Sequence, residues 1–234
     1  MKKILVLPAL VMTLIAGQAN AAGSVERLQY SWSLRGALTW IARVAVPTSG
    51  TGTLETTTGS EIDSKLMLTA PSRRDYAVYQ SRMVVDGTRT LSSMDGYRFN
   101  SKAHEQRVAF DYGEGVARVQ KNAEGRTETK VVNLQPGAPR DVLTSIHYLR
   151  LHAHEVTTPR TMQIYSGGKP YAFAVTPKAA SMLNGRRVLP FTLTPRSDGK
   201  RGEVRVWLSD DEHRVPVRIE MEQKVGTLRL DLKS

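Results

Sequence analysis

The chain has 234 residues, a length that suits one large domain or two small ones and allows a full hydrophobic core. It contains no cysteine, which excludes disulfides, thiol catalysis and Cys-ligated zinc. The formal net charge of +11 favours anionic neighbours such as phospholipid headgroups or acidic glycans, or simply maintains solubility. The sequence has no nucleic-acid-binding motif, so nucleic acid is not an expected partner.

Residues 1–21 have the three parts of a secretory signal peptide. Two lysines open the segment, an apolar run from Ile4 to Gly17 follows, and Ala19-Asn20-Ala21 matches an Ala-x-Ala cleavage site. The run is short for a membrane span, and a retained membrane anchor is the alternative. We therefore expect export to the periplasm of a Gram-negative bacterium, with no transmembrane span after cleavage. The mature chain, residues 22–234, is then expected to form a single β-rich domain.

Alternation of apolar and polar residues with period two predicts β-strands along most of the chain. Leu28, Tyr30 and Trp32 share one face of the first strand, and the second covers residues 38–46 and contains Trp40. Residues 47–52 are expected to form a turn. Further strands are expected at 53–58, 66–68, 76–85, 97–99, 108–112, 116–119 and 127–134, with Asp86-Gly87 as a hairpin turn.

One segment breaks the alternation and predicts a helix over residues 141–153. The breaker cluster Pro136-Gly137-Ala138-Pro139 precedes it, and Asp141 suits an N-cap position. Apolar residues then recur at helical spacing, namely Val142, Ile146, Leu149 and Ala153. Residues 178–183 are a candidate for a further short turn of helix.

Strands resume after the helix, at residues 162–164, 171–175 and 188–194. The last part of the chain predicts an antiparallel meander, with strands at 204–208, 215–221 and 228–232 that have one apolar and one charged face. Pro216 lacks an amide hydrogen, which indicates an edge or strand-start position. The predicted fold is mainly β (α+β with one principal helix): a strongly curved antiparallel sheet, or a partly open β-barrel, packed against the helix at about 141–153.

Three motifs are shared with a known family. They are Glu26–Trp32 near the mature start, Asp141–Ser145 with Tyr148–Arg150 in the predicted helix, and Val206–Asp211 with Val215–Val217 in the meander. These motifs resemble the domain of unknown function 3108, a bacterial exported family. The resemblance implies an envelope protein with a β-rich, half-barrel-like fold, and it transfers no catalytic residues. Between residues 47 and 135 little matches beyond the alternation.

No motif identifies an enzyme, so the sequence favours a non-catalytic protein without a cofactor. His152 and His154 with Glu155 are the best candidates for metal ligands, but no partner cluster accompanies them, and we expect no metal site. Asp210 and Asp211 are adjacent, which suits a turn better than the two opposed carboxyls of a glycosidase. A hydrolase that uses Asp211, His152 or His154 is the third hypothesis for function.

Aromatic residues recur on the predicted apolar strand faces, and two interpretations stay open. These residues pack an ordinary core, or they line a concave pocket for an acyl chain or another apolar ligand. The candidate lining residues are Tyr30, Trp32, Trp40, Phe99, Phe110, Tyr171 and Phe173. Two arginine pairs beside predicted turns are candidates for holding an anionic headgroup or are ordinary solvated loops: Arg73 with Arg74, and Arg186 with Arg187.

Two hypotheses for function therefore lead. In the first, the chain is a non-catalytic periplasmic envelope protein that binds a lipid or another apolar or anionic ligand in the concave face of its sheet. In the second, it is an envelope scaffold without a ligand pocket, which docks a protein partner or a cell-wall glycan. The volume and lining of the space inside the sheet distinguish the two hypotheses.

Overall fold

The structure is a computed structural model that describes residues 23–36, 47–72, 74–100, 102–134, 138–166, 168–196, 202–223 and 226–233. In these ranges the strands form one antiparallel sheet of 15 strands, with β8 and β9 at its two ends. The sheet is not closed into a barrel, because these end strands do not pair with each other. The predicted class, a mainly β fold with a curved, partly open sheet and one principal helix, is confirmed.

The first eight strands follow one another both along the chain and across the sheet. They are β1 (Ser24–Arg35), β2 (Ser49–Thr58), β3 (Glu61–Thr69), β4 (Tyr76–Val84), β5 (Thr90–Phe99), β6 (Lys102–Asp111), β7 (Val116–Ala123) and β8 (Arg126–Asn133). Each turn between them joins two antiparallel neighbours, so this half is a long meander.

The helix α2 (Val142–His152) separates this meander from the second half of the sheet. The second half consists of β9 (Arg160–Ser166), β10 (Lys169–Pro177), β11 (Ser181–Leu183), β12 (Arg186–Pro195), β13 (Val204–Ser209), β14 (Pro216–Gln223) and β15 (Gly226–Leu232). The last strand, β15, pairs with the first, β1, with Tyr30 opposite Leu232. This pairing joins the two halves into one sheet.

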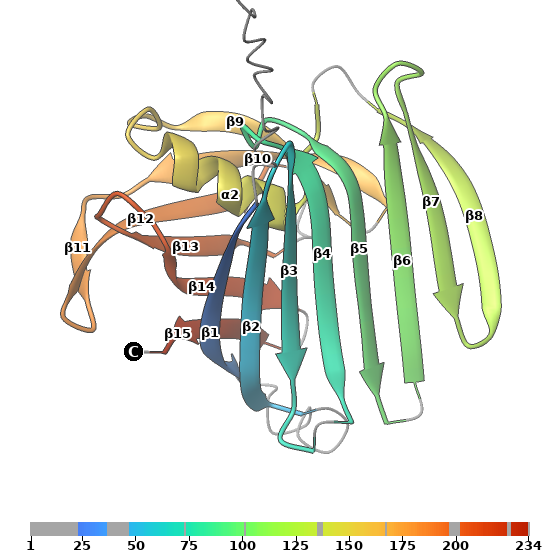
Figure 1. The fold of residues 1–234 in the computed structure, drawn as a ribbon, viewed down its shortest axis with the longest axis horizontal. Helices are drawn as coiled ribbons and strands as arrows, with labels where there is room; N and C mark the ends of the chain where they lie inside the picture. The colour runs from blue at the N-terminus through green and yellow to red at the C-terminus, as the bar shows by residue number, and fades with distance from the viewer. Residues whose placement is uncertain are drawn as a thin grey trace, which may run out of the picture.

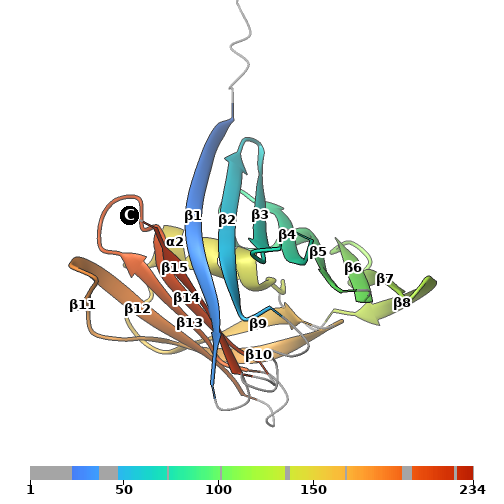
Figure 2. The same cartoon turned by 90° about the horizontal axis from the view of Figure 1, so that it is seen from below.

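The two halves of the sheet bend towards each other and enclose α2 between them. Figure 1 shows β1–β8 in front of β9–β15, with α2 between the two layers, and the view from below confirms this arrangement (Figure 2). The apolar residues of α2, among them Leu143, Ile146 and Leu149, pack into one buried cluster with inward side chains of both halves. Burial of each such side chain stabilises the fold by about 1.5–3 kcal/mol. The helix therefore fills part of the concave face.

A buried polar junction fixes the first turn of α2 to the sheet. Asp141 is the N-cap: its Oδ1 accepts a hydrogen bond from the Thr144 amide at 2.7 Å, as the sequence predicts. Its other oxygen accepts from the Ser81 hydroxyl of β4, and its amide donates to Thr90 Oγ1 of β5 at 2.9 Å. Asp141 thus caps the helix and connects it to two strands, through its carboxylate to β4 and through its amide to β5.

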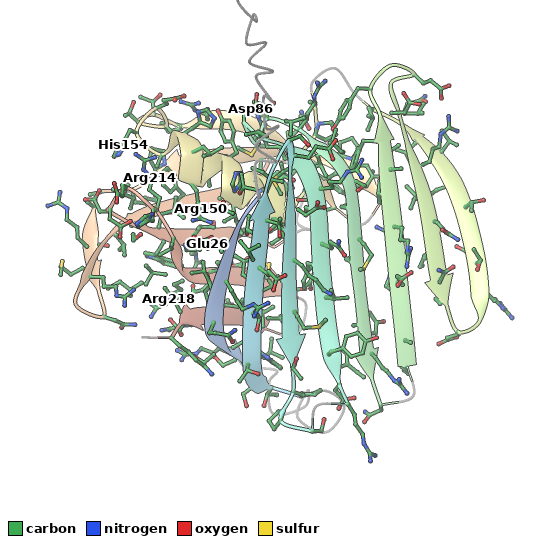
Figure 3. The ribbon with its side chains drawn as sticks, viewed as in Figure 1. Glu26, Asp86, Arg150, His154, Arg214 and Arg218 are labelled. Carbon is green, nitrogen blue, oxygen red and sulfur yellow. The ribbon has the colours of Figure 1, made fainter. Side chains whose placement is uncertain are left out.

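An ion pair fixes the last turn of α2 to the start of β1. The Arg150 guanidinium binds both carboxylate oxygens of Glu26, at 2.6 and 2.8 Å, and its Nε donates to the Arg214 carbonyl at 3.1 Å. Figure 3 shows these three residues side by side. The Arg150 side chain is only 12% exposed, so the loss of Glu26 would leave a poorly solvated charge on Arg150.

Two predicted segments have a different structure. Residues 47–52 were expected as a turn, but Ser49 already begins β2, which pairs with β1 and β3. Residues 178–183 were a candidate for a helical turn, but Ser181–Leu183 form β11, which pairs with β12. Between β11 and β12, Asn184 and Gly185 both have positive φ (51° and 76°), the conformation of a two-residue hairpin turn.

Smaller predictions agree with the structure. Asp86-Gly87 lies in the turn between β4 and β5, where Gly87 has a φ of 65°. Pro216 is the first residue of β14. The helix of the described residues, 11 residues long, is too short to cross a membrane.

We expect Asp141→Ala to lower the free energy of unfolding by about 2–4 kcal/mol, because it removes the helix cap and leaves the buried Thr144 amide and Ser81 hydroxyl without an acceptor. Urea unfolding followed by circular dichroism measures the change. Asp141→Asn is the control, since it keeps an oxygen for the Thr144 amide and should lose less. A loss below about 0.5 kcal/mol in the alanine variant would contradict the proposed junction.

Stability should also depend on the proton of His147, a largely buried residue of α2. Burial, with a further contribution from Arg150, lowers the pKa of His147 to about 4, and its Nε2 has no hydrogen-bond partner among the described residues. The unfolded chain, with a pKa near 6.5, therefore binds this proton more tightly than the folded protein does. Stability should be unaffected above pH ~6.5 and should fall by up to about 3 kcal/mol as the pH drops towards 4.

Urea unfolding of wild-type and His147→Leu protein between pH 7.5 and pH 4 tests this dependence. The difference in unfolding free energy between the two proteins should change in favour of the leucine variant as the pH falls, because only the wild type loses the stability linked to this proton. A constant difference over the whole pH range would show that His147 does not titrate in this way.

Candidate functional site

An apolar pocket of about 290 Å³ lies on the inner face of the sheet, where β1, β3 and β5 end and β4 begins. These strand ends lie below α2 in the view of Figure 1, so the helix leaves this part of the concave face uncovered. The walls consist of Trp32, Leu34, Pro47, Leu68, Ala70, Asp75, Ala77, Tyr79, Asp95, Gly96, Tyr97, Phe99, Gln223 and Leu228. The volume holds about ten methylene-sized groups at ~30 Å³ each, which is the small end of the range for ligand pockets.

Trp32 forms a rigid wall of the pocket because a hydrogen bond to Thr69 and a close contact with Gly50 hold its ring in place. Its indole Nε1 donates a hydrogen bond to the Thr69 carbonyl at 3.1 Å, across the strand β2. The residue of β2 opposite Trp32 is Gly50, where a Cβ atom would lie 2.7 Å from the indole nitrogen and 2.0 Å from the Thr69 oxygen. Only glycine allows this contact, which explains a glycine inside a strand.

Two polar side chains face the pocket from neighbouring strands. Tyr79 of β4 and Asp95 of β5 are directly opposite each other in the strand register. Burial raises the pKa of Asp95, with His104 partly opposing the shift, and burial together with the nearby Asp95 raises the pKa of Tyr79 to about 12. The Gln106 amide donates to Asp95 Oδ1 at 3.4 Å, a long hydrogen bond. The pocket is therefore apolar on most sides and polar at β4 and β5.

The second carboxyl of the pocket, Asp75, has a structural role in the loop before β4. Its Oδ1 accepts a hydrogen bond from the amide of Asn100 at 2.8 Å, and Ser72 donates to its Oδ2 at 3.4 Å. The first bond connects the loop to the residue that follows β5. Asp75 thus fixes the rim of the pocket.

A larger and shallower groove crosses the outer face of strands β3–β8. It has a volume of about 990 Å³, and its side chains are mostly polar, among them Gln80, Ser92, Gln120 and Thr129. Three arginines border it, and each has a carboxylate partner: Arg82 with Glu61 (2.7 Å), Arg107 with Glu105 (2.8 Å) and Arg118 with Glu114. The arginine charges are therefore already balanced.

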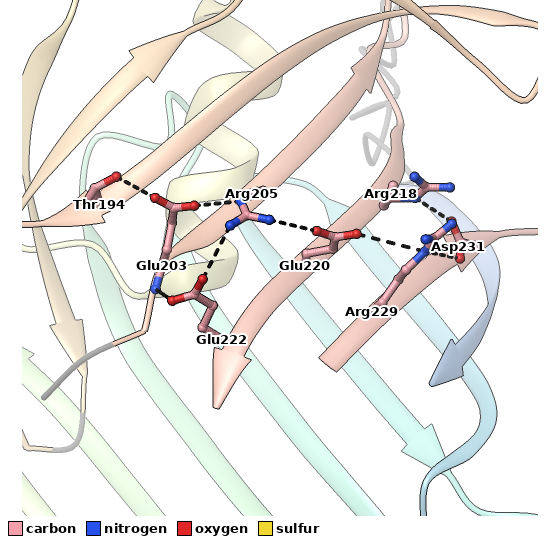
Figure 4. A network of polar contacts seen from close by, with 8 residues as sticks. All are labelled: Thr194, Glu203, Arg205, Arg218, Glu220, Glu222, Arg229 and Asp231. Carbon is pink, nitrogen blue, oxygen red and sulfur yellow. Dashed lines mark hydrogen bonds and ion pairs between the residues drawn. The ribbon is translucent and has the colours of Figure 1, made fainter. Parts of the chain in front are cut away.

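The outer face of β13–β15 has a ladder of charged residues that satisfy one another (Figure 4). Arg205 contacts three glutamates, Glu203 at 2.6 Å, Glu220 at 3.4 Å and Glu222 at 3.3 Å. In the next strands, Arg218 and Arg229 each contact Asp231 at 2.6 Å. The cross-strand pairs among them, Arg205 with Glu220 and Glu222 and Arg218 with Asp231, stabilise the register of the meander and give no indication of a ligand.

Two of the predicted aromatic lining residues, Trp32 and Phe99, lie in the wall of the pocket. Trp40 lies outside the described residues. Whether Trp32 and Phe99 contact a ligand stays a prediction, but the structure brings them together from β1 and β5.

The remaining predicted aromatic residues pack elsewhere on the inner face. Tyr30 is fully buried, and its hydroxyl donates to the Pro216 carbonyl at 2.8 Å. Phe173 belongs to the main core cluster, with the half-buried Tyr171 against it. Phe110 packs edge-on against Tyr165, with ring centres 5.0 Å apart. None of these four predicted residues lines the pocket.

Of the predicted arginines, Arg74 is exposed and precedes Asp75 at the rim of the pocket, while Arg73 lies outside the described residues. Arg186 and Arg187 begin β12, and the Arg187 Nε lies 2.6 Å from Asp210 Oδ2. Neither of them lines the pocket. The structure therefore does not bring Arg74 together with Arg186 and Arg187 at one site.

The candidates for hydrolysis or metal binding have structural contacts. His152 Nδ1 lies 3.0 Å from Glu155 Oε2, and no group of three or more metal-ligating side chains is found among the described residues. Asp211 Oδ1 accepts from the amides of His213 and Arg214, at 3.0 and 2.9 Å, within the turn between β13 and β14. His154 lies just beyond α2, in the loop before β9 (Figure 3).

Sequence reasoning missed Tyr79 and Asp95 as pocket residues. Asp95 lies two and four residues before Tyr97 and Phe99, so all three face the same side of β5. A longer predicted strand at this position would have placed Asp95 on the inner face. The spacing of Asp95 from Tyr97 and Phe99 was present in the sequence. A search for alternating apolar residues passes over it, because Asp95 is polar.

These features define a class of protein: an open, strongly curved antiparallel sheet that wraps around one helix and keeps an apolar pocket beside it. The chain belongs to the family described as "Protein of unknown function (DUF3108)", which matches residues 37–233 and confirms the resemblance seen in the sequence. A search of curated proteins finds no significant match.

Two solved structures were compared with the fold. A β-barrel-like protein of domain of unknown function DUF1849 from Brucella abortus shares the fold, with a TM-score of 0.60 and 11% identity over 89% of this chain and 95% of that chain. A putative outer membrane lipoprotein-sorting protein domain from Vibrio parahaemolyticus aligns over 90% of this chain and 83% of that chain, at 9% identity. Its TM-score of 0.27 is too low to show a shared fold.

We expect Asp95→Asn to raise the free energy of unfolding at neutral pH by about 0.5–2 kcal/mol, because it removes a poorly solvated carboxylate from the pocket. Since burial raises the folded pKa of Asp95, its contribution to stability is lost as the pH rises through that pKa. The gain in the variant should therefore be small near pH 4 and larger at pH 8.

Thermal unfolding of both proteins at pH 4 and pH 8 measures this gain. Asp63→Asn is the matched control, because Asp63 is exposed on β3, and it should change stability by less than about 0.5 kcal/mol. An Asp95→Asn variant that is less stable than the wild type at pH 8 would contradict the expectation.

Proposed function

We propose that this protein is a non-catalytic envelope protein that binds a single acyl chain or a similar apolar group in the inner-face pocket. The observation that carries the proposal is the pocket itself, about 290 Å³ of mostly apolar space beside the buried core cluster. An acyl chain exposed to water costs about 0.8 kcal/mol per methylene, so a carrier needs such a dry surface. The envelope location is part of the proposal, and the signal-peptide pattern of residues 1–21 supports it.

The size of the pocket limits the ligand and its affinity. A chain of about eight to ten methylenes would gain about 6–8 kcal/mol from transfer out of water. Ordering of the ligand and loss of its free motion reduce this gain, so we expect dissociation constants in the micromolar range or weaker. A longer chain would extend beyond the walls of Trp32, Leu68 and Phe99 into solvent.

The second candidate function is an envelope scaffold that docks a protein partner or a cell-wall glycan. The outer groove of about 990 Å³ favours it, because its glutamine, serine and threonine side chains suit hydroxyl-rich ligands. Its arginines are paired with glutamates, however, and the groove is shallow. The inner pocket is the more specific feature, and we prefer the first function for this reason.

Quenching of tryptophan fluorescence by a brominated ligand tests the proposal at a defined place. Trp32 lies in the pocket wall, while Trp207 lies on the outer face of β13, next to Arg218. A variant with Trp40→Phe and Trp207→Phe keeps Trp32, and a variant with Trp32→Phe and Trp40→Phe keeps Trp207. A terminally brominated medium-chain alcohol should quench the first variant saturably and leave the second nearly unchanged.

A blocked pocket provides the matched control. Ala77→Phe places a large ring into the pocket and should abolish the saturable quenching of Trp32, because the ligand and the new ring compete for the same space. Ala109→Phe makes the same change at an exposed position of β6, outside the pocket, and should have no effect. Equal quenching of Trp32 and Trp207, or none of either, would refute ligand binding in this pocket.

A further inference from the structure

A row of polar residues crosses the inner face of the sheet and begins in the pocket. Tyr79, Asp95, Gln106, Lys121 and Glu128 are successive partners in the registers of β4 to β8. The first two members of the row, Tyr79 and Asp95, line the pocket, while the pocket side chains from β1, β3 and β15 are apolar. A bound amphiphile would therefore have its chain against β1, β3 and β15 and its head at β4 and β5.

The two polar residues at this position have hydrogen-bonding capacity that the described part of the chain leaves unused. Asp95 has one long hydrogen bond, from Gln106 at 3.4 Å to Oδ1, and its Oδ2 has no hydrogen-bond partner there. The Tyr79 hydroxyl has no hydrogen-bond partner among those residues either. A carboxyl group in an apolar setting favours a ligand that donates a hydrogen bond to it.

The charges around the pocket also limit which charge the head group of a ligand can have. Its lining includes two carboxyl groups, Asp75 and Asp95, and no lysine, arginine or histidine among the described residues. His104 of β6 acts on Asp95 electrostatically but does not line the pocket, and Asp75 is already bonded to the Asn100 amide. A carboxylate or phosphate beside Asp95 would be repelled, whereas a hydroxyl or an ammonium group would be attracted.

We infer that the pocket recognises an amphiphile whose head group donates hydrogen bonds and has no negative charge, and that Asp95, with Tyr79 beside it, binds this head. The inference rests on the proposed function and narrows its ligand class. It differs from the expectation of an anionic headgroup, because Arg74, Arg186 and Arg187, the described arginines expected to hold such a group, do not line the pocket.

Three ligands with one chain length test the inference: decanol, decylamine and decanoate. Their affinities for the wild type at pH 7.5 are measured by displacement of a fluorescent apolar probe. The alcohol and the amine should bind about tenfold more tightly than the carboxylate, the difference expected for one hydrogen bond to a charged group. Decanoate that binds as tightly as the other two would overturn the inference but would leave the proposed function intact.

Two variants assign the selectivity to the named residues. Asp95→Asn should reduce the ratio of the affinities for decylamine and decanoate to about threefold or less. Tyr79→Phe should lower the affinity for decanol by a few-fold. Asp63→Asn, an exposed carboxyl on β3, is the control and should retain the wild-type preference. If folded Asp95→Asn protein keeps the wild-type preference for decylamine over decanoate, Asp95 does not bind the head group. If this variant does not fold, the relative affinities of the wild type for the three ligands still test the inference.

Failure of the proposed function gives a different result. If none of the three ligands displaces the probe from the wild type, the pocket is not a binding site for medium chains, and both the proposed function and the head-group inference are wrong. If all three ligands bind with equal affinity, only the inference about the head group is wrong.

Discussion

The pairing of β1 with β15 is the constraint on which the rest of the structure depends. It joins residues about 200 positions apart, Tyr30 opposite Leu232, and turns two separate meanders into one curved sheet. The Tyr30 side chain strengthens the junction, since its buried hydroxyl bonds the carbonyl at the start of β14. The pocket depends on the same pairing, because Trp32 comes from β1 and Leu228 from β15. Its formation requires closure of almost the whole chain, a contact that is entropically expensive.

The position of α2 determines where the concave face stays open. The helix is about 16 Å long, while a strand of 12 residues such as β1 extends over about 40 Å. The helix is bonded to Glu26, near the start of β1, whereas Trp32 and Leu34 lie 6 and 8 residues further along that strand. A helix of this length cannot cover both ends. The ion pair of Arg150 with Glu26 therefore leaves the pocket uncovered, and the core and the pocket share one sheet face.

Local patterns in the sequence predicted most of the elements, and long-range contacts explain the errors. The cap at Asp141 and the spacing of Ile146 and Leu149 predicted α2 to within one residue, since both signals lie within the helix. Gly50 looked like a turn residue, but it lies in β2, at a position where the Thr69 carbonyl oxygen and the Trp32 indole leave no room for a Cβ atom. Tyr30 and Trp32 have the same alternation pattern. Both belong to the buried core cluster, but only Trp32 also borders the pocket, and this difference depends on where the helix packs, which no local pattern contains.

Two aspartates with raised pKa values, the buried Asp141 and the half-buried Asp95, differ in the hydrogen bonds that the fold gives them. Burial raises the pKa of both Asp141 and Asp95, so each carboxylate destabilises the protein unless hydrogen bonds compensate. Asp141 has that compensation, with Ser81 and the Thr144 amide as donors, and its role in the helix cap accounts for its presence. Asp95 has one long bond and faces an apolar pocket instead of a helix end. The head group proposed for the pocket would supply the donor that Asp95 lacks among the described residues, so the proposed ligand and the expected cost in stability depend on the same carboxyl.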